Sequence, residues 1–208
     1  MARPNSTVVV IVGDESARVV AGLDGLANVR AVARTGARAG GDTARPAGRE
    51  SHPTGGHRHS RRTPGDDADQ RVRAAVAQSH AAYVVHDLDP LADVGAAWAG
   101  FFDRTAPAGT LEVAVEEALR SLRTKATALP DYYVVLDPDA LPETRRHWWF
   151  GVLAGASPTR VVPAAADVAT VRDTIAALRP GRWWPDPPDE WLHGLGRVVP
   201  DRAVLSTG

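Results

Sequence analysis

The chain has 208 residues, of which 44% are hydrophobic and 24% charged, and its formal net charge is −1. These values are typical of a globular protein of about one domain. The absence of Cys excludes disulfides, thiolate metal sites and cysteine nucleophiles. No apolar run is long enough to span a membrane, and the N-terminal apolar run is too short for a signal peptide. We therefore expect a cytoplasmic protein with no membrane partner.

The basic residues are biased in type, because only Lys125 among the 24 is a lysine. Asn, Gln and Ile are also scarce, and this pattern is typical of a GC-rich bacterial coding sequence. The high share of Arg is then not evidence for a nucleic-acid partner, and the near-zero net charge also makes such a partner unexpected.

The first part of the chain alternates strand and helix patterns. Residues 7–12 (Thr-Val-Val-Val-Ile-Val) form a β-branched run, which is typical of a strand buried on both faces. A turn at Gly13-Asp14-Glu15-Ser16 leads into a helical pattern, and residues 29–32 form a second short strand.

Residues 33–71 contain no Val, Ile, Leu, Met, Phe, Trp or Tyr. Such a segment cannot bury enough apolar surface to offset the entropy lost on ordering, so we predict a long, disordered, mobile insertion loop. Between Arg34 and Arg62 it carries seven Arg against Asp42 and Glu50. It is either a basic flap that contacts an anion or a solvated insertion without a role, and the second interpretation is favoured.

The rest of the chain continues the alternation. The patterns predict helices over residues 67–80, 91–102, 110–129 and 143–154, a last helix capped by Asp167, and strands over residues 82–86, 132–136 and 160–163. Thr110 is a candidate cap for the helix over residues 110–129.

Strands that alternate with helices indicate right-handed βαβ units and a mostly parallel sheet. We predict a single α/β domain over residues 1–208, with a three-layer Rossmann-like or flavodoxin-like architecture and about five strands. Residues 181–208 are rich in Trp and Pro and are predicted to form an irregular tail packed on the domain.

An Asp-x-Asp pattern follows two of the predicted strands. Tyr83-Val-Val-His-Asp-Leu-Asp89 and Tyr133-Val-Val-Leu-Asp-Pro-Asp139 share Tyr-Val-Val-x-Asp-x-Asp. Ligands of open parallel sheets bind beyond the carboxyl ends of the strands. We therefore expect Asp14, Asp87, Asp89, Asp137 and Asp139 to share one edge of the sheet.

Clustered carboxylates suit Mg²⁺ or Mn²⁺, and such an ion can bridge to a phosphate. This hypothesis assigns a metal site to Asp87, Asp89, Asp137 and Asp139. It assigns catalytic roles to the residues His86, Asp87, Asp89 and Asp137. It assigns ligand binding to Gly13, Asp14, Arg145 and Arg146.

The same Asp residues also fit a structural interpretation. An Asp after a strand caps the exposed N–H groups of the next helix, and Pro suits the first helical turn. Asp89-Pro90 has this form. Capping is the favoured interpretation, and the functional carboxylate cluster remains the alternative.

Two functions therefore stand at this point. The first is a hydrolase or transferase that acts on a nucleotide or another phosphorylated small molecule through the carboxylate cluster. The second is a non-catalytic binding or assembly module that uses its Trp-rich tail as an interface to a partner protein or in a homodimer. The sequence has neither a Gly-x-x-x-x-Gly-Lys phosphate loop nor a Gly-x-Gly-x-x-Gly after a strand.

Overall fold

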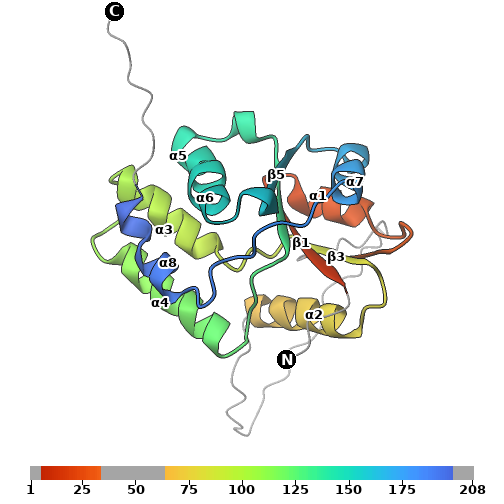
Figure 1. Ribbon diagram of the computed structural model, residues 1–208, viewed down its shortest axis with the longest axis horizontal. Coiled ribbons are helices and arrows are strands. Elements are labelled where there is room, and N and C mark those ends of the chain that lie inside the picture. The colour runs from red at the N-terminus through yellow and green to blue at the C-terminus, as the bar shows by residue number, and fades with distance from the viewer. Residues whose placement is uncertain (1–5, 34–63, 199–208) are drawn as a thin grey trace, which may run out of the picture.

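The computed structural model of the protein describes residues 6–33 and 64–198, with side chains described from residue 70 onward in the second range. The described residues form a five-stranded, all-parallel sheet in the order β2-β3-β1-β4-β5 (Figure 1). The strands are β1 (Thr7–Val12), β2 (Val29–Val32), β3 (Tyr83–His86), β4 (Tyr132–Leu136) and β5 (Val161–Ala164). The predicted α/β class and the number of strands are confirmed.

Strand β1 is the central strand and lies between β3 and β4. Val10 pairs with His86 of β3 on one side and with Tyr133 of β4 on the other. The connection from β3 to β4 therefore crosses β1, and the strand order is neither the 3-2-1-4-5 of classic dinucleotide-binding domains nor the 2-1-3-4-5 of flavodoxin.

One face of the sheet is covered by α1 (Ser16–Gly22) and α7 (Val168–Ala176), which pack against Val9 and Ile11 of β1. The predicted cap at Asp167 is confirmed, because its carboxylate accepts a hydrogen bond from the N–H of Thr170 at 2.8 Å.

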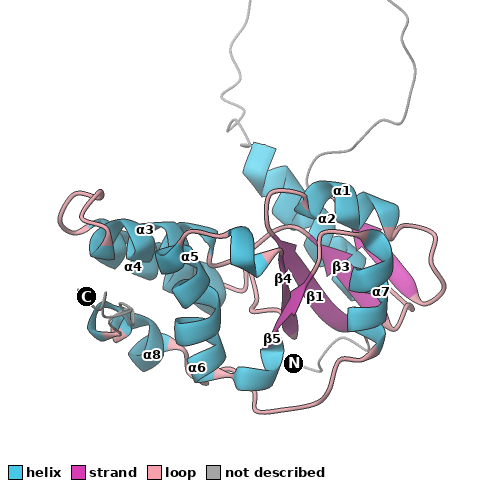
Figure 2. Ribbon diagram, turned by 90° about the horizontal axis from the view of Figure 1, so that it is seen from above, coloured by secondary structure: helices cyan, strands magenta, loops and turns pink. Residues whose placement is uncertain are grey.

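The opposite face is covered by a larger group of helices, two of which lie side by side to the left of the strands in Figure 2. These are α2 (Pro64–Gln78), α3 (Ala92–Phe102) and α4 (Thr110–Arg123). Helix α4 begins after Gly109 and ends at Arg123, earlier than predicted. Thr110 does not cap it, because its hydroxyl donates to the carbonyl of Pro107.

The predicted helix over residues 143–154 is interrupted. It begins as α5 (Glu143–His147), widens into a π-helical segment, η2 (Trp148–Leu153), and ends as α6 (Ala154–Ala156). The π-helical segment buries two pairs of adjacent residues, Trp148 with Trp149 and Val152 with Leu153. The burial of these large side chains accompanies the change of helix type.

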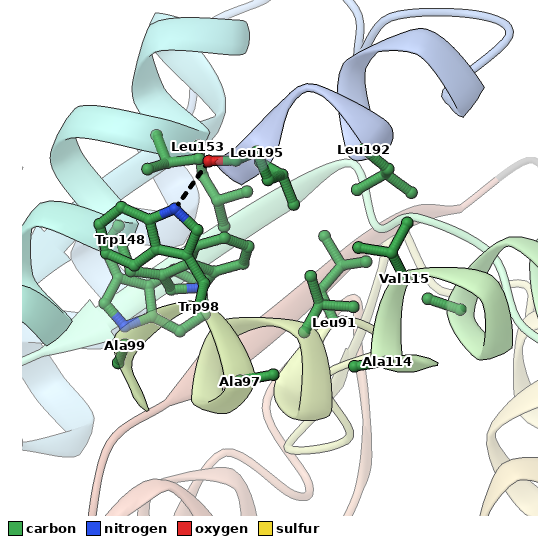
Figure 3. Packing of buried hydrophobic residues seen from close by; sticks show 14 of the residues in the cluster. Leu91, Ala97, Trp98, Ala99, Ala114, Val115, Trp148, Leu153, Leu192 and Leu195 are labelled. Atoms are coloured by element: carbon green, nitrogen blue, oxygen red, sulfur yellow. Dashed lines mark hydrogen bonds between the residues drawn. The ribbon is translucent and has the colours of Figure 1, made fainter. Parts of the chain in front are cut away.

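The predicted C-terminal tail packs on the domain, but it is not irregular throughout. It contains α8 (Asp189–His193) and a 3₁₀ turn, η4 (Leu195–Arg197), while residues 199–208 lie outside the described part. Two indole N–H groups fix its course: Trp98 donates to the carbonyl of Leu195 (Figure 3), and Trp184 donates to that of Pro130. The rings of the tail therefore serve the protein's own core.

The segment before α2 also differs from its prediction. The structure begins α2 at Pro64, so the helix includes the last residues of the segment predicted as a loop. The predicted basic stretch of the loop, residues 34–62, lies outside the described residues.

Arg160 holds the start of the tail through hydrogen bonds to its backbone. Arg160 is 7% exposed, and its guanidinium donates to three backbone carbonyls, those of Asp131, Gly181 and Arg182, at 2.7–3.1 Å. It also lies over the ring of Trp183, 4.1 Å from the centroid. A planar, always charged side chain suits this set of contacts.

We predict that Arg160→Lys lowers the free energy of unfolding by about 2–3 kcal/mol, because one ammonium cannot replace three fixed hydrogen bonds to a charged group. Urea unfolding measures the change. Arg182→Lys is the matched control, since the side chain of Arg182 is exposed. Equal small effects of the two substitutions would contradict the role given to Arg160.

Candidate functional site

A cavity of about 660 Å³ lies on the helix-rich face of the sheet. Its walls come from the start of β1, the end of β3, α2, α3, α4 and the segment before β4. The apolar part of the described lining consists of residues such as Val72, Val76, Val94, Ala114, Ala118 and Leu129. The cavity thus reaches the carboxyl end of β3, where the sequence predicted a site, and continues over the sheet to its amino end.

His86 is the last residue of β3 and lines the cavity at 5% exposure. Burial lowers the pKa of His86 to about 4, so the ring is neutral at neutral pH. The backbone N–H of Leu88 donates to Nδ1 at 3.3 Å, which assigns the ring proton to Nε2. Nε2 has no hydrogen bond to a described residue, and its N–H is therefore available to a ligand.

Asp89 follows β3 by three residues and is partly buried in the cavity wall. Its Oδ1 accepts the N–H of Leu91 at 2.8 Å and the hydroxyl of Tyr133 at 3.0 Å. The pKa of Asp89 is raised to about 6. Burial is the main cause and the nearby Asp93 contributes to it, while both hydrogen bonds and Arg145 act in the opposite direction. Asp89 therefore orders the turn before α3 but does not cap the helix as the capping interpretation predicted, because the N-cap residue is Leu91 and no side chain caps the first turn. Its carboxyl group also lines the cavity.

Tyr133 connects the two strands on either side of β1. It lies on β4, is fully buried, and its hydroxyl reaches Asp89 beyond the end of β3. Burial and the carboxylate of Asp89 raise the pKa of Tyr133 well above its usual value. The hydroxyl consequently keeps its proton and acts as the donor in this hydrogen bond.

The Asp residues after β4 serve other contacts. Asp137 is exposed and its Oδ1 accepts the N–H of Ala166 at 3.0 Å, which joins the end of β4 to the segment before α7. The side chain of Asp139 is fully exposed and lies 3.9 Å from Arg146. Neither lines the cavity of His86 and Asp89.

The remaining predicted site residues also lie outside the lining of this cavity. Asp14 and Arg145 are exposed, and Asp87 is partly buried. Gly13 has a structural role, because a Cβ there would come within 2.9 Å of the Cβ of Leu136 and its φ is +129°.

The predicted metal site is not assembled in this part of the chain. Within residues 6–33 and 64–198, no three His, Asp or Glu side chains form a group that could hold a metal ion. The prediction of Mg²⁺ or Mn²⁺ therefore gains no support from the geometry of the described residues.

A second, shallower cavity of about 440 Å³ contains two of the predicted residues, Asp139 and Arg146. It lies beside α5 and the π-helical segment, and Glu143 and His147 also line it. The ring of His147 stacks on Trp98 with its centroid 5.9 Å away. This cavity combines charges of both signs and is more open than the first.

The lining also includes residues with polar side chains that were not predicted as site residues, among them Asp93, Glu117, Thr127 and Asp131. These four come from α3, from α4, from the segment after α4 and from the residue before β4. Asp131 accepts the N–H of Val8 at 2.7 Å, and its own N–H donates to the carbonyl of Val8, which aligns the amino ends of β1 and β4. No spacing in the sequence signals that these residues meet, because only the strand order brings them together.

Comparison of the chain with protein-family models, with curated proteins and with solved structures gave no significant match. Among the described residues, no helix is long and apolar enough to cross a membrane. The functional argument therefore rests on the geometry of the site.

We predict a pH-dependent effect of Asp89→Asn, which keeps an oxygen for Leu91 and Tyr133 but removes the titration. A carboxyl group whose pKa is raised on folding stabilises the protein fully below its unfolded pKa, and this contribution is lost as the pH rises through about 6. Relative to the wild type, the variant should gain about 2–3 kcal/mol of unfolding free energy between about pH 4 and pH 7.

Urea unfolding across this pH range measures the difference, from which the titration of His86 cancels because both proteins contain it. Asp24→Asn, at an exposed residue, is the control for the change of residue type. A difference between Asp89→Asn and the wild type that stays constant with pH would contradict the raised pKa.

Proposed function

We propose that the protein binds a small organic molecule in the cavity over β1 and β3, with His86 and Asp89 as its principal polar contacts. The observation that carries this proposal is a cavity with apolar walls in which an N–H donor and a carboxyl group are both held in fixed positions. A few placed polar groups in a mostly apolar cavity are the usual features of a ligand site.

The size of the cavity supports this proposal. Its volume of about 660 Å³ lies within the range of about 300–1,000 Å³ of small-molecule sites. Its position at the carboxyl end of β3, next to the crossover over β1, also agrees with where open α/β sheets bind ligands.

The pair His86 and Asp89 supports proton exchange with a bound molecule. A carboxyl group with a pKa of about 6 is mostly ionised at neutral pH but is half-protonated only about one pH unit lower, so it can exchange a proton close to the pH at which an acid–base group works best. The neutral ring of His86 offers a hydrogen bond without a charge. Hydrolase or transferase activity stays a prediction, because the geometry supports a binding site and a proton-exchanging group but not a specific reaction.

The alternative of an assembly module loses the observation that motivated it. Trp184 is 2% exposed and Trp148 is 1% exposed, so these rings are occupied within the protein's own core. Trp183 and Trp191 are partly buried, and Trp183 carries the guanidinium of Arg160 over its ring. A homodimer or a partner protein therefore stays a prediction without support from the tail.

The test uses N-phenyl-1-naphthylamine, an uncharged dye whose fluorescence rises in an apolar site. The proposal predicts saturable binding to one site on the wild-type protein. Ala118→Phe and Ser121→Phe place a ring from α4 into the cavity and should each weaken binding at least about tenfold, because the ring takes the volume that the dye needs.

Ala96→Phe is the matched control, because Ala96 is exposed on α3 and is not part of the cavity lining. Circular dichroism confirms that each variant is folded. The proposal fails if the wild type does not bind the dye, or if a folded cavity variant binds it as well as Ala96→Phe does.

A further inference from the structure

The charge of the cavity wall is one-sided. Four carboxylates line it, from different parts of the chain: Asp89, Asp93, Glu117 and Asp131. The described lining includes no Lys and no Arg, and burial keeps the ring of His86 neutral. An anion placed there would meet repulsion from several sides in a partly desolvated site, where charge interactions are stronger than in water.

No described cation lines the cavity itself. The guanidinium of Arg160 lies behind the wall, over the ring of Trp183, and is held by three backbone carbonyls. Arg145 acts on Asp89 from a distance, but its side chain is exposed and does not line the cavity. Arg71 and Arg73 flank Val72 on α2, and both are exposed.

The carboxylates are spread along the cavity. Asp131 lies at the amino end of the sheet, and Asp89 lies at the carboxyl end. At Asp89, both hydrogen bonds from the protein go to Oδ1, whereas Oδ2 accepts none from a described residue. One oxygen of this partly buried carboxylate is thus open to a donor on a ligand.

Two further polar atoms of the wall point to a ligand. His86 is 5% exposed, and its Nε2 has no hydrogen-bond partner among the described residues. Thr127 Oγ1 is buried and also has no partner in the described part of the chain. A buried polar atom without a partner, such as Thr127 Oγ1, is costly, and a ligand that carries an uncharged oxygen can accept a hydrogen bond from the wall.

We propose that the ligand is an organic cation, a protonated amine or amidine on an apolar body, whose charged group binds Asp89 Oδ2. This inference rests on the proposed function and names the class of its ligand. A charged N–H group bound to a carboxylate forms a shorter and stronger hydrogen bond than a neutral pair does. The apolar body would lie against Ala114, Ala118 and Val94, and an oxygen on it would accept the N–H of His86.

The inference departs from the expectation of a phosphorylated ligand. That expectation depended on a metal ion, or on Arg145, Arg146 or the basic loop at the same site as the carboxylates, and the basic loop lies outside the described residues. In the described residues neither Arg lines the cavity, and Arg146 instead lies beside Asp139 in the second cavity.

The test compares three probes of similar shape: benzamidine, which is cationic, benzamide, which is neutral, and phenyl phosphate, which is anionic. Binding to the full chain is followed by the methyl NMR signals of Ala118 and Thr127, both in the cavity wall. We expect benzamidine to bind at least about tenfold more tightly than benzamide, and phenyl phosphate to bind most weakly.

Variants assign the preference to the carboxylates. Asp89→Asn should reduce the advantage of benzamidine over benzamide at least about fivefold, because the substitution removes the negative charge. Asp93→Asn tests the same idea at an exposed residue whose substitution does not endanger folding, and a smaller reduction is expected there. Asp24→Asn, at an exposed residue outside the cavity, is the matched control.

The outcomes separate the two proposals. If none of the probes binds, the proposed function fails together with the ligand class. If benzamide or phenyl phosphate binds as well as benzamidine, or if neither cavity variant changes the preference, the cationic ligand is wrong while the binding cavity stands.

Discussion

The position of β1 between β3 and β4 is the constraint on which the candidate site depends. Because β1 separates the two strands, only a long side chain from β4 can reach the segment after β3, and Tyr133 does so through its hydrogen bond to Asp89. The same carboxylate accepts the N–H of Leu91, the residue that precedes α3. Asp89 thus links β4 to the turn between β3 and α3, and these contacts set the orientation of the acidic group in the cavity.

This arrangement explains why a residue with a structural role can also be a functional one. The turn before α3 and ligand binding compete only if they need the same oxygen, and both protein donors use Oδ1 of Asp89. The surrounding apolar walls raise the pKa of Asp89 and lower that of His86. Burial therefore raises the pKa of the carboxyl group toward the neutral range while it keeps the imidazole uncharged. Of this pair, Asp89 is the group that can change its charge close to neutral pH.

Local patterns were enough to predict much of the fold. The β-branched run over residues 7–12 predicts a buried parallel strand, and Asp167 predicts a helix start that the structure confirms. Long-range order was not accessible in this way. The Asp-x-Asp pattern after β4 resembles the one after β3. Asp137, however, accepts the N–H of Ala166, because β5 and the segment before α7 lie beside the end of β4, and Asp139 faces solvent.

A crystal structure of the protein with bound benzamidine tests the central claim most directly. The account predicts the amidinium against Oδ2 of Asp89, with the ring over Ala114 and Ala118 of α4 and with the hydrogen bond between Tyr133 and Asp89 retained. Benzamidine bound instead beside Asp139 and Glu143 in the second cavity, with the cavity of His86 and Asp89 free of it, would contradict the account.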